Sequence, residues 1–229
     1  MLARFKQEVT LSRRFNHRNV IRLYDIGTYG NHKYITMELL TGDSLRAMMA
    51  EQAVSMRTRL DLLIQACNGL QCVHDRGVIH RDVKPENFFV TDEGTLKIMD
   101  FGIAKRRSTG RALTMAGMMA GTPQYMAPEQ INNFTTVTHL ADLYSLGCIA
   151  YELFTGTLPF HHEDLQPLLT MHLNHAPEPP SARNPNIPSD IEAVILQLLE
   201  KDPTQRFQSS RALANALDSI QERLGEDAG

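Results

Sequence analysis

Two short β runs that enclose a polar turn constrain the fold of this chain more than any other feature of its sequence. Apolar residues at 88–90 and 96–99 flank the turn 91–95 (Thr-Asp-Glu-Gly-Thr), which predicts a β-hairpin. Polar residues gather immediately outside both ends of this hairpin, at 80–87 and 100–102. Because paired strands lie side by side, we expect these two polar segments to meet at one edge of a small sheet.

A second hairpin is predicted nearer the start of the chain. The β runs 20–25 and 34–39 lie on either side of Gly30-Asn31, a dipeptide that is typical of tight hairpin turns. A loosely amphipathic pattern over residues 3–15 predicts a helix ahead of this hairpin.

The rest of the chain is predicted to be mostly helical. Apolar residues recur at helical spacing over 56–76, 139–155 and 210–224, and glycines follow the first two runs. Ser189 and Glu192 have the spacing of a capping box, which predicts another helix start. Five prolines within 177–188 predict an extended loop. The expected fold class is α+β.

Composition excludes several classes of protein. The 229 residues suffice for one large domain or two small ones, and 42% apolar with 21% charged residues is ordinary globular usage. A net charge of −3 provides no basic field for nucleic acid or an anionic membrane. No stretch reaches the roughly 18 apolar residues of a membrane span, and the three cysteines form no zinc-type pair. We expect a soluble cytoplasmic protein, with surface histidines at His161, His162, His172 and His175.

The two polar segments carry the most specific chemical signal. Residues 80–87 (His-Arg-Asp-Val-Lys-Pro-Glu-Asn) and 100–102 (Asp-Phe-Gly) resemble the catalytic loop and the metal-binding triplet of protein kinases, in the same order and at the same separation. The resemblance implies that Asp82 accepts the proton of the attacking hydroxyl and that Lys84 neutralises charge on the transferred phosphoryl group. It further implies ATP as cofactor and Mg²⁺ bound by Asn87 and Asp100.

The resemblance continues through residues 121–129 (Gly-Thr-Pro-Gln-Tyr-Met-Ala-Pro-Glu), which look like the segment that docks a protein substrate in this family. Lys84 together with Thr122 is similar to the serine/threonine-specific branch, which implies proteins with serine or threonine as partners. A phosphate on Thr109 or Thr114 would pair with Arg81 and order the loop between the triplet and this segment. A solvated basic loop with incidental hydroxyls is the alternative.

Three further residues match structural positions of the family. Glu129 and Arg206 match a buried ion pair that anchors the segment 121–129, and Asp142 matches a residue that binds the backbone of the catalytic loop.

The start of the chain resembles part of an ATP-binding lobe. Residues 35–40 are similar to the strand and hinge that bind adenine, with Met37 as gatekeeper and backbone groups of Glu38 and Leu40 for the purine. Phe89 falls where the family usually has a smaller aliphatic residue under the adenine ring, and simple core packing is its alternative. Glu8 fits the glutamate that pairs with the ATP-binding lysine, and a solvated surface glutamate is its alternative.

The family's glycine-rich loop and its V-A-I-K strand are missing ahead of Glu8. The resemblance therefore implies residues 1–40 as a partial N-lobe lacking its first three strands and 41–229 as an entire, mostly helical C-lobe. The chain is most similar to bacterial serine/threonine kinases of the eukaryotic (Hanks) type, truncated at the N-terminus and weak or inactive alone. The alternative is a kinase-like module that binds proteins without catalysis. The oligomeric state is not indicated.

Overall fold

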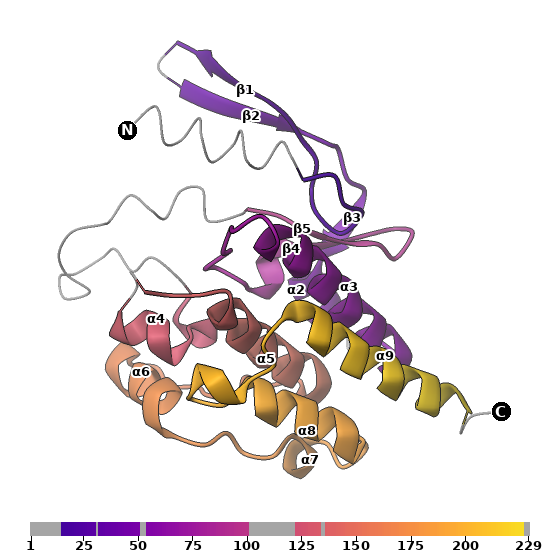
Figure 1. The fold of residues 1–229 in the computed structure, drawn as a ribbon, viewed down its shortest axis with the longest axis vertical. Coiled ribbons are helices and arrows are strands. Elements are labelled where there is room, and N and C mark those ends of the chain that lie inside the picture. Colours follow the sequence, from indigo (N-terminus) through magenta and orange to yellow (C-terminus); the bar gives the residue numbers. More distant parts are fainter. Residues whose placement is uncertain (1–14, 31, 51–53, 101–121, 134–135, 227–229) are drawn as a thin grey trace.

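The computed structural model describes residues 15–30, 32–50, 54–100, 122–133 and 136–226. Figure 1 shows a β-hairpin at one end of the molecule, helices at the other, and a small sheet between them. The predicted helix 3–15 lies almost wholly outside the described residues.

The first hairpin is formed by β1 (Leu23–Tyr29) and β2 (His32–Met37). The strands are antiparallel, with Tyr29 paired to His32 across the tight turn that Gly30-Asn31 predicted. The prediction of a hairpin is confirmed, although its first strand starts three residues later than expected. Val20 instead forms a parallel bridge with Ile98, which joins the chain ahead of the hairpin to the second sheet.

The second sheet has the strand order β3-β4-β5 and confirms the central hairpin of the sequence analysis. Strand β4 (Phe88–Thr91) pairs antiparallel with β5 (Leu96–Ile98). Strand β3 (Gly42–Ser44), which was not predicted, pairs with the other edge of β4. Gly42 has φ +132, and a Cβ there would lie 2.2 Å from the Val90 carbonyl oxygen, so this close pairing requires glycine.

The helical body is built around α5 (Leu140–Thr155), which is buried along nearly its whole length. Helices α3 (Met56–His74) and α9 (Ser210–Glu226) pack closely on each other, and α8 (Ser189–Leu198) contacts α5. The remaining elements are short: α2 (Leu45–Ala50), η1 (Pro85–Asn87), η3 (Pro123–Tyr125), α4 (Pro128–Asn132), α6 (Leu165–Asn174), α7 (Pro180–Arg183) and η4 (Pro203–Gln205). The predicted α+β fold class is confirmed.

The end of α3 shows how local sequence sets a boundary. Gly77 has φ +70, and its N–H donates to the His74 carbonyl at 2.8 Å. The N–H of Val78 reaches back to the Val73 carbonyl at 3.3 Å, which completes a Schellman motif. The predicted glycine stop is confirmed.

The region around the proline-rich loop differs from the prediction. Residues 180–183 form the short helix α7 within the expected extended loop. Glu192 accepts a hydrogen bond from the Ser181 N–H at 2.6 Å, and the N-cap residue of α8 is Pro188, so Ser189 is the first residue of the helix and not its cap. The capping box was therefore wrong, although the helix it predicted exists, because the Glu192 carboxylate binds the first turn of a neighbouring helix instead.

His172 was predicted on the surface and is instead buried. Its Nδ1 lies 2.9 Å from the Tyr144 hydroxyl, and its ring packs edge-on against Phe160 at 5.0 Å. Burial, together with the nearby charge of Lys201, lowers the pKa of His172 to about 3. The sequence prediction failed because His172 lies on the inner face of α6, whereas the other three histidines are exposed.

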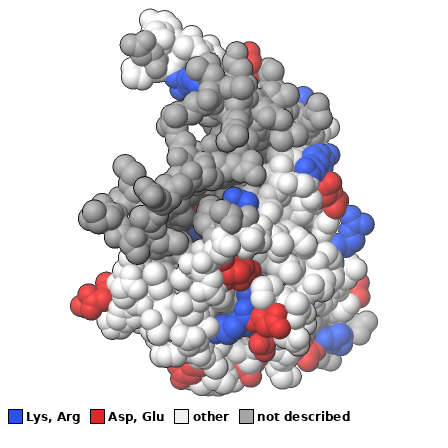
Figure 2. Space-filling model, turned by 60° about the vertical axis from the view of Figure 1, so that its left-hand side comes forward, with Lys and Arg blue, Asp and Glu red and all other residues white. Residues whose placement is uncertain are grey.

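The described surface carries locally mixed charge. On the face shown in Figure 2, acidic and basic side chains occur in small neighbouring groups, and neither sign forms a broad patch. Among the residues that the structure describes, every helix is too short or too polar to cross a membrane.

Candidate active site

A buried carboxylate on α5 binds the backbone of the loop 80–87. Asp142 of α5 is 1% exposed, and its two oxygens accept the backbone N–H groups of His80 at 2.9 Å and Arg81 at 2.8 Å. His74 Nε2 lies 2.7 Å from Oδ2. Burial alone would raise the pKa of Asp142, but these hydrogen bonds and the charges of His74 and His80 outweigh it and lower the pKa.

Two residues beside the hairpin ends have unusual backbone geometry. Arg81 has φ 65 and Asp100 has φ 49, a region that residues other than glycine rarely occupy. Such conformations cost of order 1–3 kcal/mol and persist where surrounding bonds enforce them. Asp142 supplies such a bond at Arg81. Strained backbone at both polar segments favours a functional role for this edge of the sheet.

Four predicted site residues lie in direct contact. Asn87 Nδ2 donates to the backbone carbonyl of Asp82 at 2.7 Å and to its Oδ2 at 3.3 Å. Lys84 Nζ lies 3.5 Å from the same Oδ2 and donates to the Thr122 hydroxyl at 3.2 Å. A carboxylate, an ammonium group and an amide therefore converge at the end of the hairpin, together with a hydroxyl from the segment 121–129.

Asp100 is placed beside this group by the hairpin itself. The Met99 N–H donates to the Asn87 carbonyl at 2.8 Å, so the residues that leave β5 and enter β4 are adjacent. Asp100 is exposed, whereas Asn87 is 5% exposed. The Asn87 Nδ2 is bonded to Asp82, and its Oδ1 is the acceptor atom of the amide. Hard oxygens from Asn87 and Asp100 are the donor type that Mg²⁺ prefers.

The predicted adenine-binding residues border the second sheet. The Glu38 N–H donates to the Arg22 carbonyl at 3.0 Å. The Glu38 carboxylate accepts from Lys97 Nζ at 2.8 Å, and Lys97 is the cross-strand partner of Phe89. Met37 is 43% exposed at the end of β2, and Leu40 is partly buried against the core.

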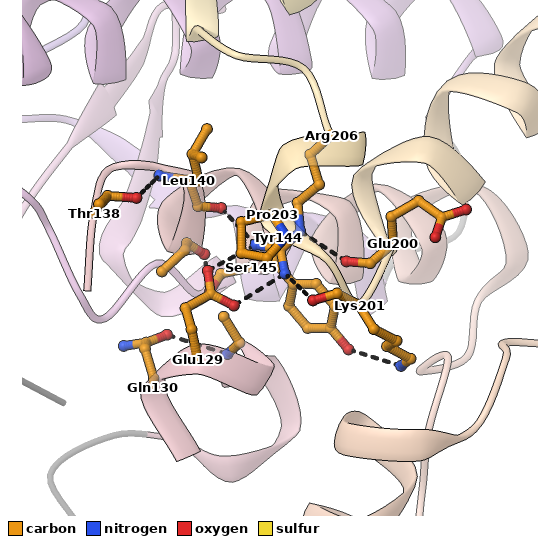
Figure 3. Close-up of polar contacts among 12 residues, drawn as sticks. Glu129, Gln130, Thr138, Leu140, Tyr144, Ser145, Glu200, Lys201, Pro203 and Arg206 are labelled. Carbon is orange, nitrogen blue, oxygen red and sulfur yellow. Dashed lines mark hydrogen bonds and ion pairs between the residues drawn. The ribbon is translucent and has the colours of Figure 1, made fainter. Parts of the chain in front are cut away.

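The ion pair between Glu129 and the buried Arg206 is bidentate (Figure 3). The Arg206 side chain is 0% exposed, and its two Nη atoms lie 2.8 and 2.9 Å from the Glu129 oxygens. Its remaining N–H groups donate to backbone carbonyls at 2.7 to 3.2 Å, from Glu200, Leu140 and Lys201. All five donors of the guanidinium are used, and the group lies over the Tyr144 ring at 4.9 Å.

A second polar cluster, which the sequence did not indicate, lies beneath the segment 121–129. Arg46 of α2 lies 2.9 Å from Glu86 and 2.7 Å from Glu152, and it also contacts the Tyr125 hydroxyl. That hydroxyl donates to Glu152 at 2.6 Å. No local pattern marked these residues, because their partners lie 27 to 106 positions away in sequence.

Gln130 and Ser145 were also missed, and both bind this part of the chain. Gln130 accepts from the Ala127 N–H at 3.1 Å and donates to the Arg81 carbonyl at 3.2 Å. Ser145 donates to the Tyr125 carbonyl at 2.6 Å. Ser145 lies three residues after Asp142 on α5, so both side chains lie on the same face of the helix. This spacing is the one sequence signal that could have indicated a role for Ser145 beside that of Asp142.

Three predicted site residues cannot be placed with the rest. Glu8, Thr109 and Thr114 lie outside the described residues. Their assigned roles, like the division of the chain at residue 40, stay predictions.

Comparison with known proteins agrees with this geometry. The family model described as "Protein kinase domain" matches residues 2–217. A probable serine/threonine-protein kinase of Clostridium perfringens is 34% identical over 221 residues, which cover 96% of this chain and 32% of that protein. Pkn1, a serine/threonine-protein kinase of Myxococcus xanthus, is 38% identical over 221 residues, or 95% of this chain and 32% of Pkn1.

The fold is also similar to a solved kinase structure. The crystal structure of Rad53 1-466 in complex with AMP-PNP matches with a TM-score of 0.78 and 25% sequence identity, over 93% of this chain and 54% of that one. The chain spans about a third of the length of the bacterial relatives it matches. With the family model covering nearly its whole length, the chain belongs to the protein kinase domain family, and its relatives are bacterial serine/threonine kinases of the Hanks type.

Proposed function

We propose that the protein containing this chain is a serine/threonine protein kinase that transfers the γ-phosphate of ATP to serine or threonine hydroxyls of protein substrates. The observation that carries the proposal is the convergence of Asp82, Lys84 and Asn87 at the hairpin end, with Thr122 bonded to Lys84. The names of the relatives support the same reaction class and do not favour the alternative of a module without catalysis.

Asp82 is the proposed acceptor of the substrate proton. Phosphoryl transfer depends mainly on positioning and charge stabilisation, so the carboxylate must be held in one orientation. Asn87 bonds both the carbonyl and Oδ2 of Asp82, and Asp142 holds the two residues before it. The carboxylate can therefore orient the attacking hydroxyl and accept its proton as the new bond to phosphorus forms.

Lys84 and Thr122 are proposed to act together on the phosphoryl group and the substrate. The ammonium group lies between the Asp82 carboxylate and the Thr122 hydroxyl, at 3.5 and 3.2 Å. From this place it neutralises negative charge on the transferred phosphoryl group. The hydroxyl of Thr122 keeps it there, which supports the serine/threonine class.

ATP and Mg²⁺ fit the donor set of the site. Asn87 and Asp100 would hold the metal through oxygen atoms, and the bound metal would neutralise charge on the phosphates. Backbone groups of Glu38 and Leu40, with Met37 and Phe89 as apolar neighbours, would bind the purine. We place the reaction in the cytoplasm, where ATP is supplied.

The proposal is tested by label transfer from Mg-ATP to a basic protein substrate, with the complete natural protein and with this chain. Asp82→Asn should lower the transfer rate of the complete protein at least about 100-fold, because it removes the proton acceptor. Asp92→Asn is the matched control, since Asp92 is exposed in the β4–β5 turn. Equal transfer by the wild type and Asp82→Asn would refute the assignment and leave the protein-binding alternative.

A separate binding measurement tests the metal ligands. Asp100→Ala should abolish the Mg²⁺-dependent part of nucleotide binding in isothermal titration, because it removes one hard oxygen ligand. Binding that keeps its full Mg²⁺ dependence would contradict this role for Asp100.

A further inference from the structure

Gln130 is a buried side chain with a specific placement between two functional segments. It lies on α4 and is 3% exposed. Its Oε1 accepts from the Ala127 N–H at 3.1 Å, and its Nε2 donates to the Arg81 carbonyl at 3.2 Å. Burying a primary amide is unfavourable unless both of its ends are bonded. Gln130 meets this condition by joining the segment 121–129 to the loop 80–87.

The carbonyl that Gln130 binds belongs to the peptide unit immediately before Asp82. The N–H of this same unit, on Asp82, lies 3.3 Å from His80 Nδ1. The preceding N–H, on Arg81, is bound by Asp142 at 2.8 Å. Arg81 itself has φ 65, a strained conformation that surrounding bonds must enforce. The orientation of the Asp82 side chain depends on this conformation.

Gln130 also lines the pocket in which Asp82 lies. Both the loop and the segment 121–129 contribute to this pocket, which is lined by Arg81, Asp82, Val83, Thr122, Tyr125, Met126, Gln130 and Ser145. Gln130 therefore bonds the backbone of both the segment 121–129 and the loop 80–87 at the pocket that Asp82 and Thr122 also line.

We propose that Gln130 is a positioning residue for phosphoryl transfer, which fixes the Arg81–Asp82 peptide and couples the orientation of the Asp82 carboxylate to the segment 121–129. This inference rests on the proposed function. Its physical basis is that loss of the Nε2 donor removes one of the bonds that hold the strained Arg81–Asp82 peptide, so the peptide can rotate and carry the carboxylate away from the attacking hydroxyl.

Gln130→Glu separates the two bonds of this side chain. It keeps the shape and the acceptor for the Ala127 N–H, and in its ionised form it has no donor for the Arg81 carbonyl. Because misplacement by about 1 Å can cost on the order of 100-fold in rate, we expect kcat to fall by about 10- to 100-fold. The KM for ATP should stay within about twofold, because Gln130 does not contact the predicted nucleotide ligands.

Gln65→Glu is the matched control. Gln65 is also a bridging amide, which donates to Asp61 at 2.7 Å and to the Gly94 carbonyl at 3.0 Å, away from the pocket. It should leave kcat unchanged. Unchanged kcat in folded Gln130→Glu, an equal loss of kcat in Gln65→Glu, or a rise in KM that accounts for the whole loss would each overturn the proposal.

A second readout does not depend on activity. Amide hydrogen exchange at residues 81–83 of the complete protein should accelerate at least about tenfold in Gln130→Glu and stay unchanged in Gln65→Glu. If the wild type transfers no phosphate, the proposed function fails, and the exchange measurement still decides the role of Gln130. Equal exchange in both variants and the wild type would refute the positioning role.

Discussion

Truncation of either side of the Glu129–Arg206 pair is expected to destabilise the protein far more than loss of an exposed ion pair. The Arg206 side chain is 0% exposed and bonds Glu129 and three backbone carbonyls. Arg206→Ala leaves these acceptors without their donor, and Glu129→Ala leaves a buried cation without its counterion. Breaking one side of a buried pair costs about 3–5 kcal/mol. For a domain of this size that corresponds to a fall of roughly 6–20 °C in the melting temperature.

The assay is urea unfolding of the two single variants and the double variant. The chain has no tryptophan, so unfolding is followed by circular dichroism at 222 nm. The two losses should not add, because the second truncation removes a group already left unpaired, and the cycle should give a coupling of about 2–3 kcal/mol. The exposed pair of Arg183 and Glu178, at 2.5 Å with side chains 42% and 47% exposed, is the control and should couple by less than about 1 kcal/mol. Similar coupling in the two pairs would refute the reasoning.

Two further predictions concern stability. The pKa of His172 is about 3 in the folded state and 6.5 ordinarily. Between pH 6.5 and pH 3 the unfolded state therefore binds a proton that the folded state does not, so the free energy of unfolding falls as the pH drops. From pH 7 to pH 5, urea unfolding should show the wild type losing about 2 kcal/mol more than His172→Asn; parallel curves would contradict this. Gly42→Ala should lower the free energy of unfolding by at least about 2 kcal/mol more than Gly94→Ala. Both glycines have positive φ, but of the two only Gly42 has backbone atoms where the added Cβ would lie. Equal urea midpoints for the two variants would contradict this.

The sequence predicted those parts of the fold whose causes are local. Alternating apolar residues around a polar turn indicated the β4–β5 hairpin, and Gly77 indicated the end of α3, because turn and cap geometry depend on a few neighbouring residues. The order and spacing of the segments 80–87 and 100–102 carried the resemblance to protein kinases. The hairpin then explains why Asn87 and Asp100 come to adjacent strand ends.

The sequence predictions were wrong for two polar side chains whose partners lie elsewhere in the fold. Glu192 has the local spacing of a capping residue but binds Ser181, and His172 looks like a surface histidine but is buried against Tyr144 and Phe160. Strand β3 was not predicted, because three residues are too few to show an alternating pattern.

Local pattern by itself determined the strands of the hairpin and the main helices, because each depends on backbone preferences over one or two turns. The family resemblance indicated the residues at 82, 84, 87 and 100, and it also indicated Asp142 and the Glu129–Arg206 pair. Packing decided the exact atoms that these groups bind, and it alone revealed the support from Gln130. Asp142, Gln130 and Arg206 bind atoms 49 to 77 positions away, and such contacts exist only once the helices have packed and the desolvation of every buried polar group has to be offset by a partner.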